Sequence, residues 1–133
     1  MLDHVDVGPR PLSAYVDIIG DEAVQEIREL AAPFRGARMA HINATTYGGG
    51  VSELLRSIVP LYRGLGIQAD WKIVSADPQF FTVTKAFHNA LQGASYELSS
   101  ATRETYLMYN TRNAELLDEE YDFIVVHDPQ PAA

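Results

Sequence analysis

The chain has 133 residues, 47% of them hydrophobic, which fits one compact domain that buries a core of its own. Eighteen acidic against ten basic residues give a net charge of −8, so the surface repels phosphate backbones and anionic lipids, and we expect neither nucleic acid nor a membrane as a partner. The sequence has no cysteine, which excludes disulfides and thiolate metal sites, and it shows no targeting or membrane-spanning pattern, so we expect a cytoplasmic protein.

The chain is predicted to consist of an N-terminal arm over residues 1–20 and a domain over residues 21–133. One glycine and two prolines precede Gly20, which predicts an extended arm that docks on the domain. Apolar residues recur at helical spacing over 22–32, and Asp21 can cap a helix there. The domain is therefore expected to begin with a helix.

The next part of the sequence predicts two strands joined by a helix. A strand is expected over 38–43, then a glycine loop at 48–50, an amphipathic helix that begins at Val51, and a second strand over 68–74. A strand, a crossover helix and a strand in this order form a parallel, right-handed unit. The sheet is therefore expected to be open and parallel.

The remaining sequence predicts two helices and a buried strand. Helices are expected over 78–91 and, after a serine cap, over about 99–117, and a β-branched apolar run predicts a strand over 122–127. A further short strand is possible over 94–98. The acidic residues near 115–122 are interpreted as a solvated helix end and loop. The predicted fold class is α/β: a three-layer, Rossmann-like domain with an open parallel sheet.

The glycine loop, Gly48, Gly49 and Gly50, lies between a predicted strand and a predicted helix. Free amides and the positive end of the helix dipole at such a place favour an anion, and phosphate is the natural ligand. The spacing is neither that of the dinucleotide fingerprint nor that of a P-loop, which argues against a nicotinamide enzyme and an ATPase. Alternatively, the glycines only permit a tight turn.

Polar side chains end two of the predicted strands. Asn43 and His41 finish the first, and His127 and Asp128 follow the last. Ligands of open parallel sheets bind beyond the carboxyl ends of the strands, so these residues are candidates for one crevice. The Asp128 carboxylate can accept hydrogen bonds from sugar hydroxyls or steady a positive charge on a sugar ring, or it satisfies local amides in a turn before Pro129. His41 is a candidate for packing as well as for chemistry.

Lys85, His88 and Asn89 share one region of a predicted helix. They can bind phosphate or sugar hydroxyls if that region lines a cleft, or they form a solvent-facing stripe. The four histidines of the chain show no metal-ligand spacing, so we expect no metal.

Three blocks of sequence taken together, His41–Glu53, Phe80–Gly93 and Val126–Pro131, resemble trehalose synthases of the glycosyltransferring type and the related trehalose phosphorylases. The resemblance covers most of the chain, from about Leu12 onward. It implies a GT-B architecture, in which two Rossmann-like domains face each other across a cleft. It also implies transfer of glucose from a nucleoside diphosphate glucose, ADP- or UDP-glucose, to glucose with retention, which forms trehalose.

The resemblance further implies roles for particular residues. Gly48, Gly49 and Gly50 would face the donor diphosphate. Asp128 would be the catalytic residue and, with His127, would bind sugar hydroxyls. The remaining substrate-binding residues are expected to line the same cleft and are Asn43, Lys85, His88 and Asn89. No cofactor is expected beyond the substrate nucleotide sugar.

The chain departs from this family in what it lacks. The nucleotide pocket, the basic residues for the leaving diphosphate and the acidic residue for the donor sugar belong mainly to the family's second domain. We therefore expect an incomplete N-terminal, acceptor-side GT-B domain that is inactive alone and whose partner is the missing C-terminal domain. Its uncovered surface is expected to favour a homo-oligomer. The alternatives are a non-catalytic sugar- or nucleotide-binding module, or an interaction module, and half of a trehalose phosphorylase.

Overall fold

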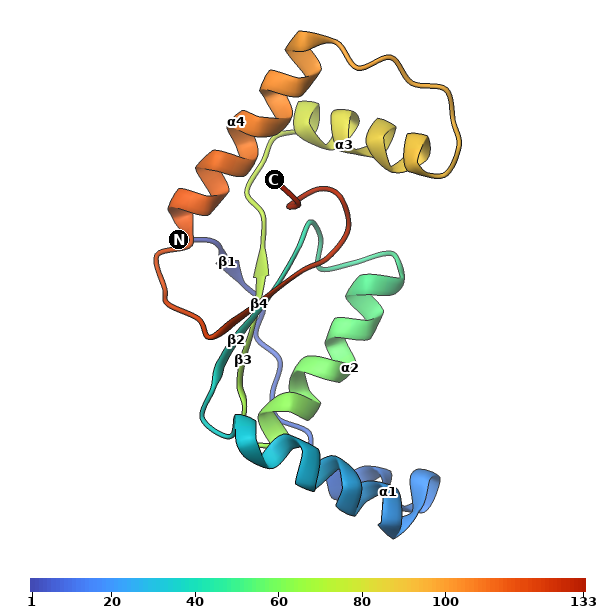
Figure 1. The fold of residues 1–133 in the computed structure, drawn as a ribbon, viewed down its shortest axis with the longest axis vertical. Coiled ribbons are helices and arrows are strands. Elements are labelled where there is room, and N and C mark those ends of the chain that lie inside the picture. Colours follow the sequence, from blue (N-terminus) through green and yellow to red (C-terminus); the bar gives the residue numbers. More distant parts are fainter.

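The structure is a computed structural model that describes residues 1–133. An open four-stranded sheet forms its centre (Figure 1). The spatial order of the strands is β1 (Asp3–His4), β3 (Gln68–Ile73), β2 (Arg38–Asn43) and β4 (Phe123–Val126). β2 is parallel to both β3 and β4, in register from Arg38↔Gln68 and Met39↔Phe123. The three predicted strands and the predicted parallel unit are confirmed.

β1 corrects the prediction of an entirely parallel sheet. It pairs antiparallel with β3, through Asp3↔Ile73 and His4↔Lys72. It extends into the chain that follows, because the Val5 amide donates to the Trp71 carbonyl at 2.9 Å. This arm covers the edge of β3 that would otherwise be open.

The helices connect the strands in the predicted order. In chain order they are η1 (Leu12–Tyr15), α1 (Val16–Ala31), η2 (Ala32–Phe34), α2 (Gly50–Gly64), α3 (Pro78–Leu91) and α4 (Ser100–Leu116). The hydroxyl of Ser99 caps α4, as the sequence predicts, by accepting from the Thr102 amide at 3.2 Å. None of these helices is long and apolar enough to cross a membrane.

The arm is less extended than the sequence predicts. Residues 12–19 are helical, and Gly20 interrupts α1 with φ 81° and ψ 162°, so the helix consists of a short turn and a longer piece. Backbone at these angles is almost restricted to glycine. The glycine signal that was expected to end an extended arm therefore marks a break between two helical pieces.

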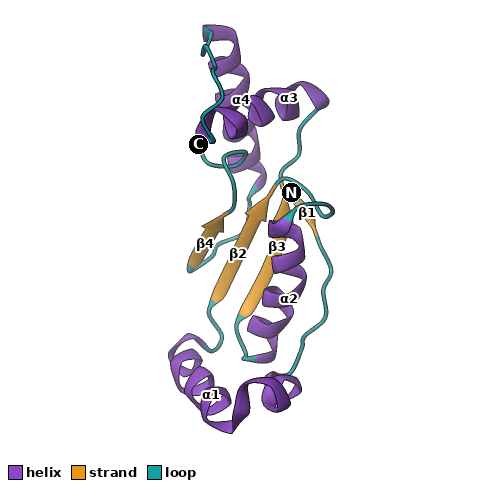
Figure 2. Cartoon of the chain, turned by 90° about the vertical axis from the view of Figure 1, so that its right-hand side faces the viewer, coloured by secondary structure: helices purple, strands orange, loops and turns teal.

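The possible strand over 94–98 does not form. Gly93, with φ 98°, follows α3, and the chain then crosses to α4 as an exposed loop far from the sheet (Figure 1). α3 and α4 pack against each other beyond the carboxyl ends of the strands (Figure 2). Residues 94–98 therefore have no neighbouring strand to pair with.

The core is divided between the two faces of the sheet. On one face Ala69 and Trp71 of β3 pack against Leu55 and Val59 of α2. On the other face a second cluster joins the sheet to α3 and α4 and consists of Ala40, Ile42, Val74, Phe80 and Tyr109. The alternation of side chains along a strand produces this division.

The acidic turn before β4 is not simply solvated. The buried Lys72 Nζ lies 2.9 Å from Glu119 Oε2, and the Tyr121 hydroxyl contacts both Glu119 and Asp70. Lys72 lies on the face of β3 that packs toward this turn, because its side chain alternates with that of Trp71. This network ties the turn to the sheet, which corrects the interpretation of the acidic run as wholly solvated.

Candidate functional site

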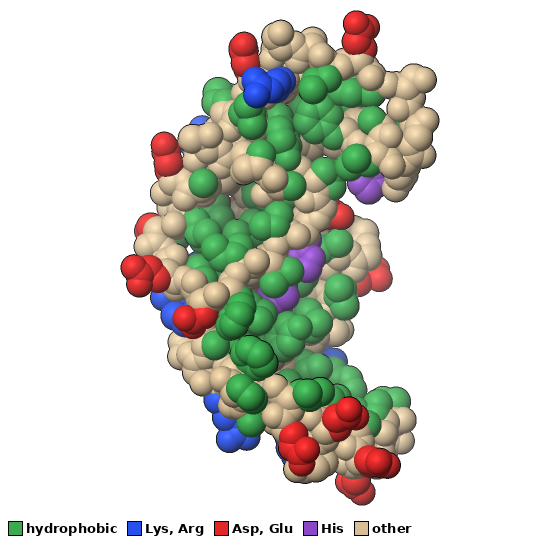
Figure 3. Space-filling model, viewed as in Figure 1, with side chains coloured by type: hydrophobic (Ala, Val, Ile, Leu, Met, Phe, Trp, Pro, Cys, Tyr) green, Lys and Arg blue, Asp and Glu red, His purple; other side chains and the backbone are tan.

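A polar hollow of about 520 Å³ lies where the carboxyl ends of the strands meet the N-terminus of α2. In the view of Figure 3 the surface is notched between the lobe that contains α3 and the region of α2. Six of the residues that the sequence singles out line this hollow: Asn43, Gly48, Gly49, Gly50, His88 and Asp128. The structure thus brings together residues from three of the predicted candidate groups, contributed by β2, the glycine loop, α3 and the segment after β4.

The glycine loop leaves the first amides of α2 open to this hollow. Gly48 has φ 74°, and Gly49 has φ 90° and ψ 156° and forms the N-cap without a side-chain hydrogen bond. The amides of Gly50, Val51 and Ser52 donate to no acceptor within the chain. Unpaired amides at a helix N-terminus attract an anion, so the loop makes both the tight turn and a surface suited to phosphate.

Replacing Gly49 with alanine is expected to lower the free energy of unfolding by about 1–3 kcal/mol, because its backbone lies in a region that side chains rarely adopt. Gly50→Ala is the matched control. Gly50 has no positive φ, and an added Cβ would meet nothing within 4 Å, so this change should leave the stability unchanged or slightly raised. Chemical denaturation measures both, and equal effects of the two changes would contradict the assignment of strain to Gly49.

The side chain of Asn43 connects the sheet to the segment that leads into the glycine loop. Its Oδ1 accepts from Trp71 Nε1 at 2.7 Å, and its Nδ2 donates to the Thr45 carbonyl at 2.8 Å. The same carbonyl accepts from the Ser52 hydroxyl at 2.9 Å. Asn43 is almost fully buried, so both polar atoms of its side chain fasten β2, β3 and the start of α2 together at the floor of the hollow.

Asp128 reaches the hollow because hydrogen bonds hold the residues before and after it, His127 and Pro129, in place. The His127 amide donates to the Ile42 carbonyl at 2.9 Å, and the Tyr106 hydroxyl of α4 donates to the Pro129 carbonyl at 2.8 Å. Between these anchors Asp128 has φ 65°, the only positive φ outside glycine. Its carboxylate is exposed at the edge of the hollow, where it can accept hydrogen bonds from a ligand.

Gln130 is a site residue that the sequence did not single out. It lines the hollow, and its side-chain oxygen is buried without a hydrogen-bond partner. Its backbone carbonyl accepts from Asn110 Nδ2 at 3.1 Å, which holds the segment against α4. In the sequence, only its position two residues after Asp128 indicated that Gln130 belongs to the site.

His127 does not line the hollow, and its side chain contacts a second histidine. Its Nε2 lies 2.9 Å from His41 Nδ1, the two rings are inclined by 20° with centroids 5.2 Å apart, and the His41 ring also lies nearly parallel to the Tyr62 ring, with centroids 5.6 Å apart. Burial, and secondarily His127, lowers the pKa of His41 to about 4. Burial also lowers the pKa of His127, although Asp128 opposes this. Both rings are therefore neutral near pH 7.

The buried His41 is expected to make the protein less stable in mild acid. Its pKa falls from 6.5 when unfolded to about 4 when folded, so between these values the unfolded chain binds more protons. The free energy of unfolding should therefore be fully retained above pH 6.5 and should decrease as the pH falls toward about 4. His41→Phe should flatten this slope in urea denaturation. A variant whose slope matches the wild type would contradict the buried neutral state of His41.

Lys85 and Asn89 lie on α3 but do not line the hollow. Both are exposed, and only His88 of the three predicted helical residues reaches it, with its Nε2 3.0 Å from Gln92 Nε2. Residues one turn apart share a side of the helix, but α3 turns only the His88 position toward the hollow. No group of three or more His, Cys, Asp or Glu side chains lies together in a way that would hold a metal ion.

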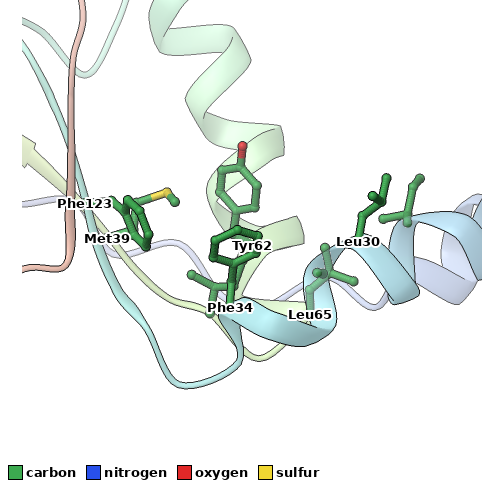
Figure 4. Close-up of a pocket in the computed structure, with 9 residues that line it drawn as sticks. Leu30, Phe34, Met39, Tyr62, Leu65 and Phe123 are labelled. Atoms are coloured by element: carbon green, nitrogen blue, oxygen red, sulfur yellow. The ribbon is translucent and has the colours of Figure 1, made fainter.

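A second, apolar groove of about 420 Å³ lies at the opposite end of the sheet (Figure 4). Nine hydrophobic residues line it, including Phe34, Tyr62 and Phe123, the first and last of which pack edge to face at 5.8 Å. It offers almost no polar group to a substrate. The hollow at the carboxyl ends of the strands is therefore the candidate site for chemistry.

The fold and the hollow define a class of protein: an α/β domain with a polar hollow at the carboxyl ends of its parallel strands. The particular family follows from comparison with known sequences. Residues 41–133 match the family model described as "Trehalose synthase, N-terminal domain", and this match includes every predicted site residue. The chain belongs to the trehalose synthase N-terminal domain family, which confirms the resemblance stated from the sequence.

Curated relatives agree with this assignment. The trehalose synthase of Rubrobacter xylanophilus is 50% identical over 99% of this chain and 32% of its own length. The trehalose synthase of Pyrococcus horikoshii is 47% identical over 95% of this chain and 31% of its own length. A trehalose phosphorylase of Pleurotus pulmonarius is 23% identical over 90% of this chain. The chain thus spans about a third of the length of the trehalose synthases it matches.

Proposed function

We propose that this chain is the acceptor-side domain of a retaining glucosyltransferase that forms trehalose from glucose and a nucleoside diphosphate glucose, ADP- or UDP-glucose. The observation that carries the proposal is the shared hollow, which presents unpaired α2 amides and the Asp128 carboxylate together. The proposal includes a GT-B enzyme in which this three-layer, Rossmann-like domain faces a second domain.

The glycine loop suits the diphosphate of the donor. The amides of Gly50, Val51 and Ser52 are unpaired, and Gly48 and Gly49 carry no side chain that would keep a phosphate at a distance. As the glucosyl bond breaks, negative charge grows on the departing diphosphate. Fixed N–H dipoles at a helix N-terminus stabilise that charge without reorganising.

The carboxylate of Asp128 suits the sugar. It can accept hydrogen bonds from two hydroxyls of one glucose, and its negative charge stabilises the positive charge that develops at the anomeric carbon. In the proposed role it therefore acts as the catalytic residue of this domain. Asn43 and His88 line the same hollow. His127, next to Asp128 but outside this lining, would contribute if the bound sugar extends to it, and Lys85 and Asn89 only if the facing domain extends the site over α3.

The second domain is the proposed main partner. This half of the cleft supplies no lysine or arginine to the lining of the hollow, so it cannot by itself neutralise a departing diphosphate. We therefore propose that the chain alone forms no trehalose. A coupled assay with ADP-glucose or UDP-glucose and glucose tests this, and trehalose formation by the isolated chain would contradict it.

Self-association is a further proposal, based on uncovered apolar surface. The outer edge of β4 is unpaired, its side chains Phe123, Ile124 and Val126 are 41–51% exposed, and the apolar groove opens beside it. Apolar side chains are numerous on this side of the molecule (Figure 3). Such a surface favours pairing with a second copy. Light scattering tests this, and a strictly monomeric chain at high concentration would contradict it.

Two alternative functions differ from the main proposal in the ligand bound or in the product formed. The similarity to a trehalose phosphorylase favours inorganic phosphate as the anion at the α2 amides, in place of a nucleoside diphosphate. A non-catalytic module would bind sugar or nucleotide without forming product even in the presence of a second domain. Competition between phosphate and UDP-glucose at the hollow, followed by calorimetry, separates the first alternative from the main proposal.

A further inference from the structure

His41 and His127 form a part-buried hydrogen-bonded pair, and His41 has no role in the proposed chemistry so far. His41 is only 3% exposed, whereas His127 is partly exposed. One hydrogen bond, 2.9 Å long, joins His41 Nδ1 to His127 Nε2. The residues are 86 positions apart, one on β2 and one after β4, so the contact depends on the pairing of these two strands.

The other ring nitrogen of His41, Nε2, indicates which of the two histidines donates this hydrogen bond. His41 Nε2 is buried and has no hydrogen-bond partner. A buried unpaired N–H is rarer in proteins than a buried unpaired acceptor, so Nε2 carries no hydrogen. A neutral His41 then has its hydrogen on Nδ1 and donates to His127 Nε2.

The same bond fixes the state of His127. Because its Nε2 accepts, a neutral His127 carries its hydrogen on Nδ1. His127 Nδ1 has no partner within the chain, and it is not among the buried unpaired atoms, so it reaches solvent. We propose that His41 is a positioning residue that locks His127 in the Nδ1–H state, so that a hydrogen-bond donor is presented next to the Asp128 acceptor.

A donor beside an acceptor matches the chemistry of a sugar. Each hydroxyl of a glucose unit both donates and accepts, so adjacent hydroxyls can bind Asp128 and His127 Nδ1–H together. This consequence rests on the proposed function, whereas the protonation state of His127 does not. The charged and titratable groups that face the pair are Asp128, on the side of His127, and Tyr62, which stacks on His41.

The protonation state can be read directly from the imidazole nitrogens. In long-range proton–nitrogen correlation spectra of the chain at neutral pH, the protonated and bare nitrogens have distinct chemical shifts. The His127 ring is assigned in the wild type itself, by through-bond correlation of its ring nuclei with its backbone. We expect His127 to be protonated on Nδ1 in the wild type, and a wild-type His127 protonated on Nε2 would overturn the proposal even if no variant folds.

Two variants test whether His41 sets this state. His41→Phe keeps an aromatic ring next to Tyr62 but removes the donor, so the Nδ1–H state of His127 should lose its preference and both nitrogens should show the shifts of mixed tautomers. In His41→Asn the side-chain amide nitrogen replaces the Nδ1–H donor, so His127 should stay protonated on Nδ1. A His127 that keeps Nδ1–H in His41→Phe would overturn the role of His41.

Binding measurements separate this proposal from the proposed function. Calorimetry with trehalose should show about fivefold weaker binding for His41→Phe, the factor of one neutral hydrogen bond, and less than about twofold for His41→Asn. Equal losses in both variants would contradict the link to the ligand. Absence of trehalose binding by the wild type, with the expected protonation state, would count against the proposed function and leave the role of His41 intact.

Discussion

Replacing Trp71 with alanine is expected to lower the free energy of unfolding by about 3–5 kcal/mol, a large part of the stability of a domain of this size. Trp71 is fully buried on β3 and packs with Leu55 and Val59 of α2. Its loss removes the largest fully buried side chain of the protein and leaves a cavity between β3 and α2. Urea denaturation of the folded chain measures the change.

Trp71→Phe is the control that separates packing from the hydrogen bond. Phenylalanine keeps much of the ring volume but leaves Asn43 Oδ1 without the indole donor, which now lies 2.7 Å away. The expected loss is about 1–3 kcal/mol. A loss in Trp71→Ala no greater than in Trp71→Phe would show that the packing between α2 and the sheet is not what stabilises this face.

Replacing Asp128 with asparagine is expected to weaken binding of glucose or trehalose by roughly 10- to 100-fold, the effect of losing charged hydrogen bonds. The carboxylate is exposed and lines the hollow, so its charge acts on a ligand more than on the fold. Asparagine also tolerates the left-handed backbone of this position, where φ is 65°. The free energy of unfolding should therefore change little.

Asp118→Asn is the matched control for this change. It removes the same charge from an exposed aspartate that does not line the hollow. Sugar affinity should stay within about twofold of the wild type, because exposed charges at a distance are screened by salt. Equal effects of Asp118→Asn and Asp128→Asn would assign the loss to net charge and would contradict the role of Asp128.

Periodic or continuous runs of apolar residues were sufficient to predict β2, β3, β4, α2 and α3, whereas α4 was predicted from its serine cap. It did not predict β1, because Asp3 and His4 are polar and two residues carry no pattern. The start of α1 was also missed. Val16, Ile18 and Ile19 are β-branched and apolar, which resembles extended chain, but the structure continues η1 directly into a helical turn there, although Ile18 is 80% exposed.

The sequence predicted those parts of the candidate site that lie at or directly after the end of a strand. The glycine loop, Asn43 and Asp128 follow the carboxyl ends of β2 and β4, and a parallel sheet brings such ends together. Contacts between distant residues were not predictable in this way. The pairing of His41 with His127 depends on strand order, and the bond from Trp71 to Asn43 depends on register.

The central claim is that the hollow binds the diphosphate and the sugar of a trehalose-forming reaction. Titration of the chain with UDP-glucose, ADP-glucose, glucose and trehalose, followed by backbone amide spectra, tests it most directly. Nucleotide sugars should shift the amides of Gly50, Val51 and Ser52, and glucose or trehalose should shift Asp128 and Gln130. Shifts confined to the apolar groove around Phe34 and Phe123, or none at millimolar ligand, would contradict the claim.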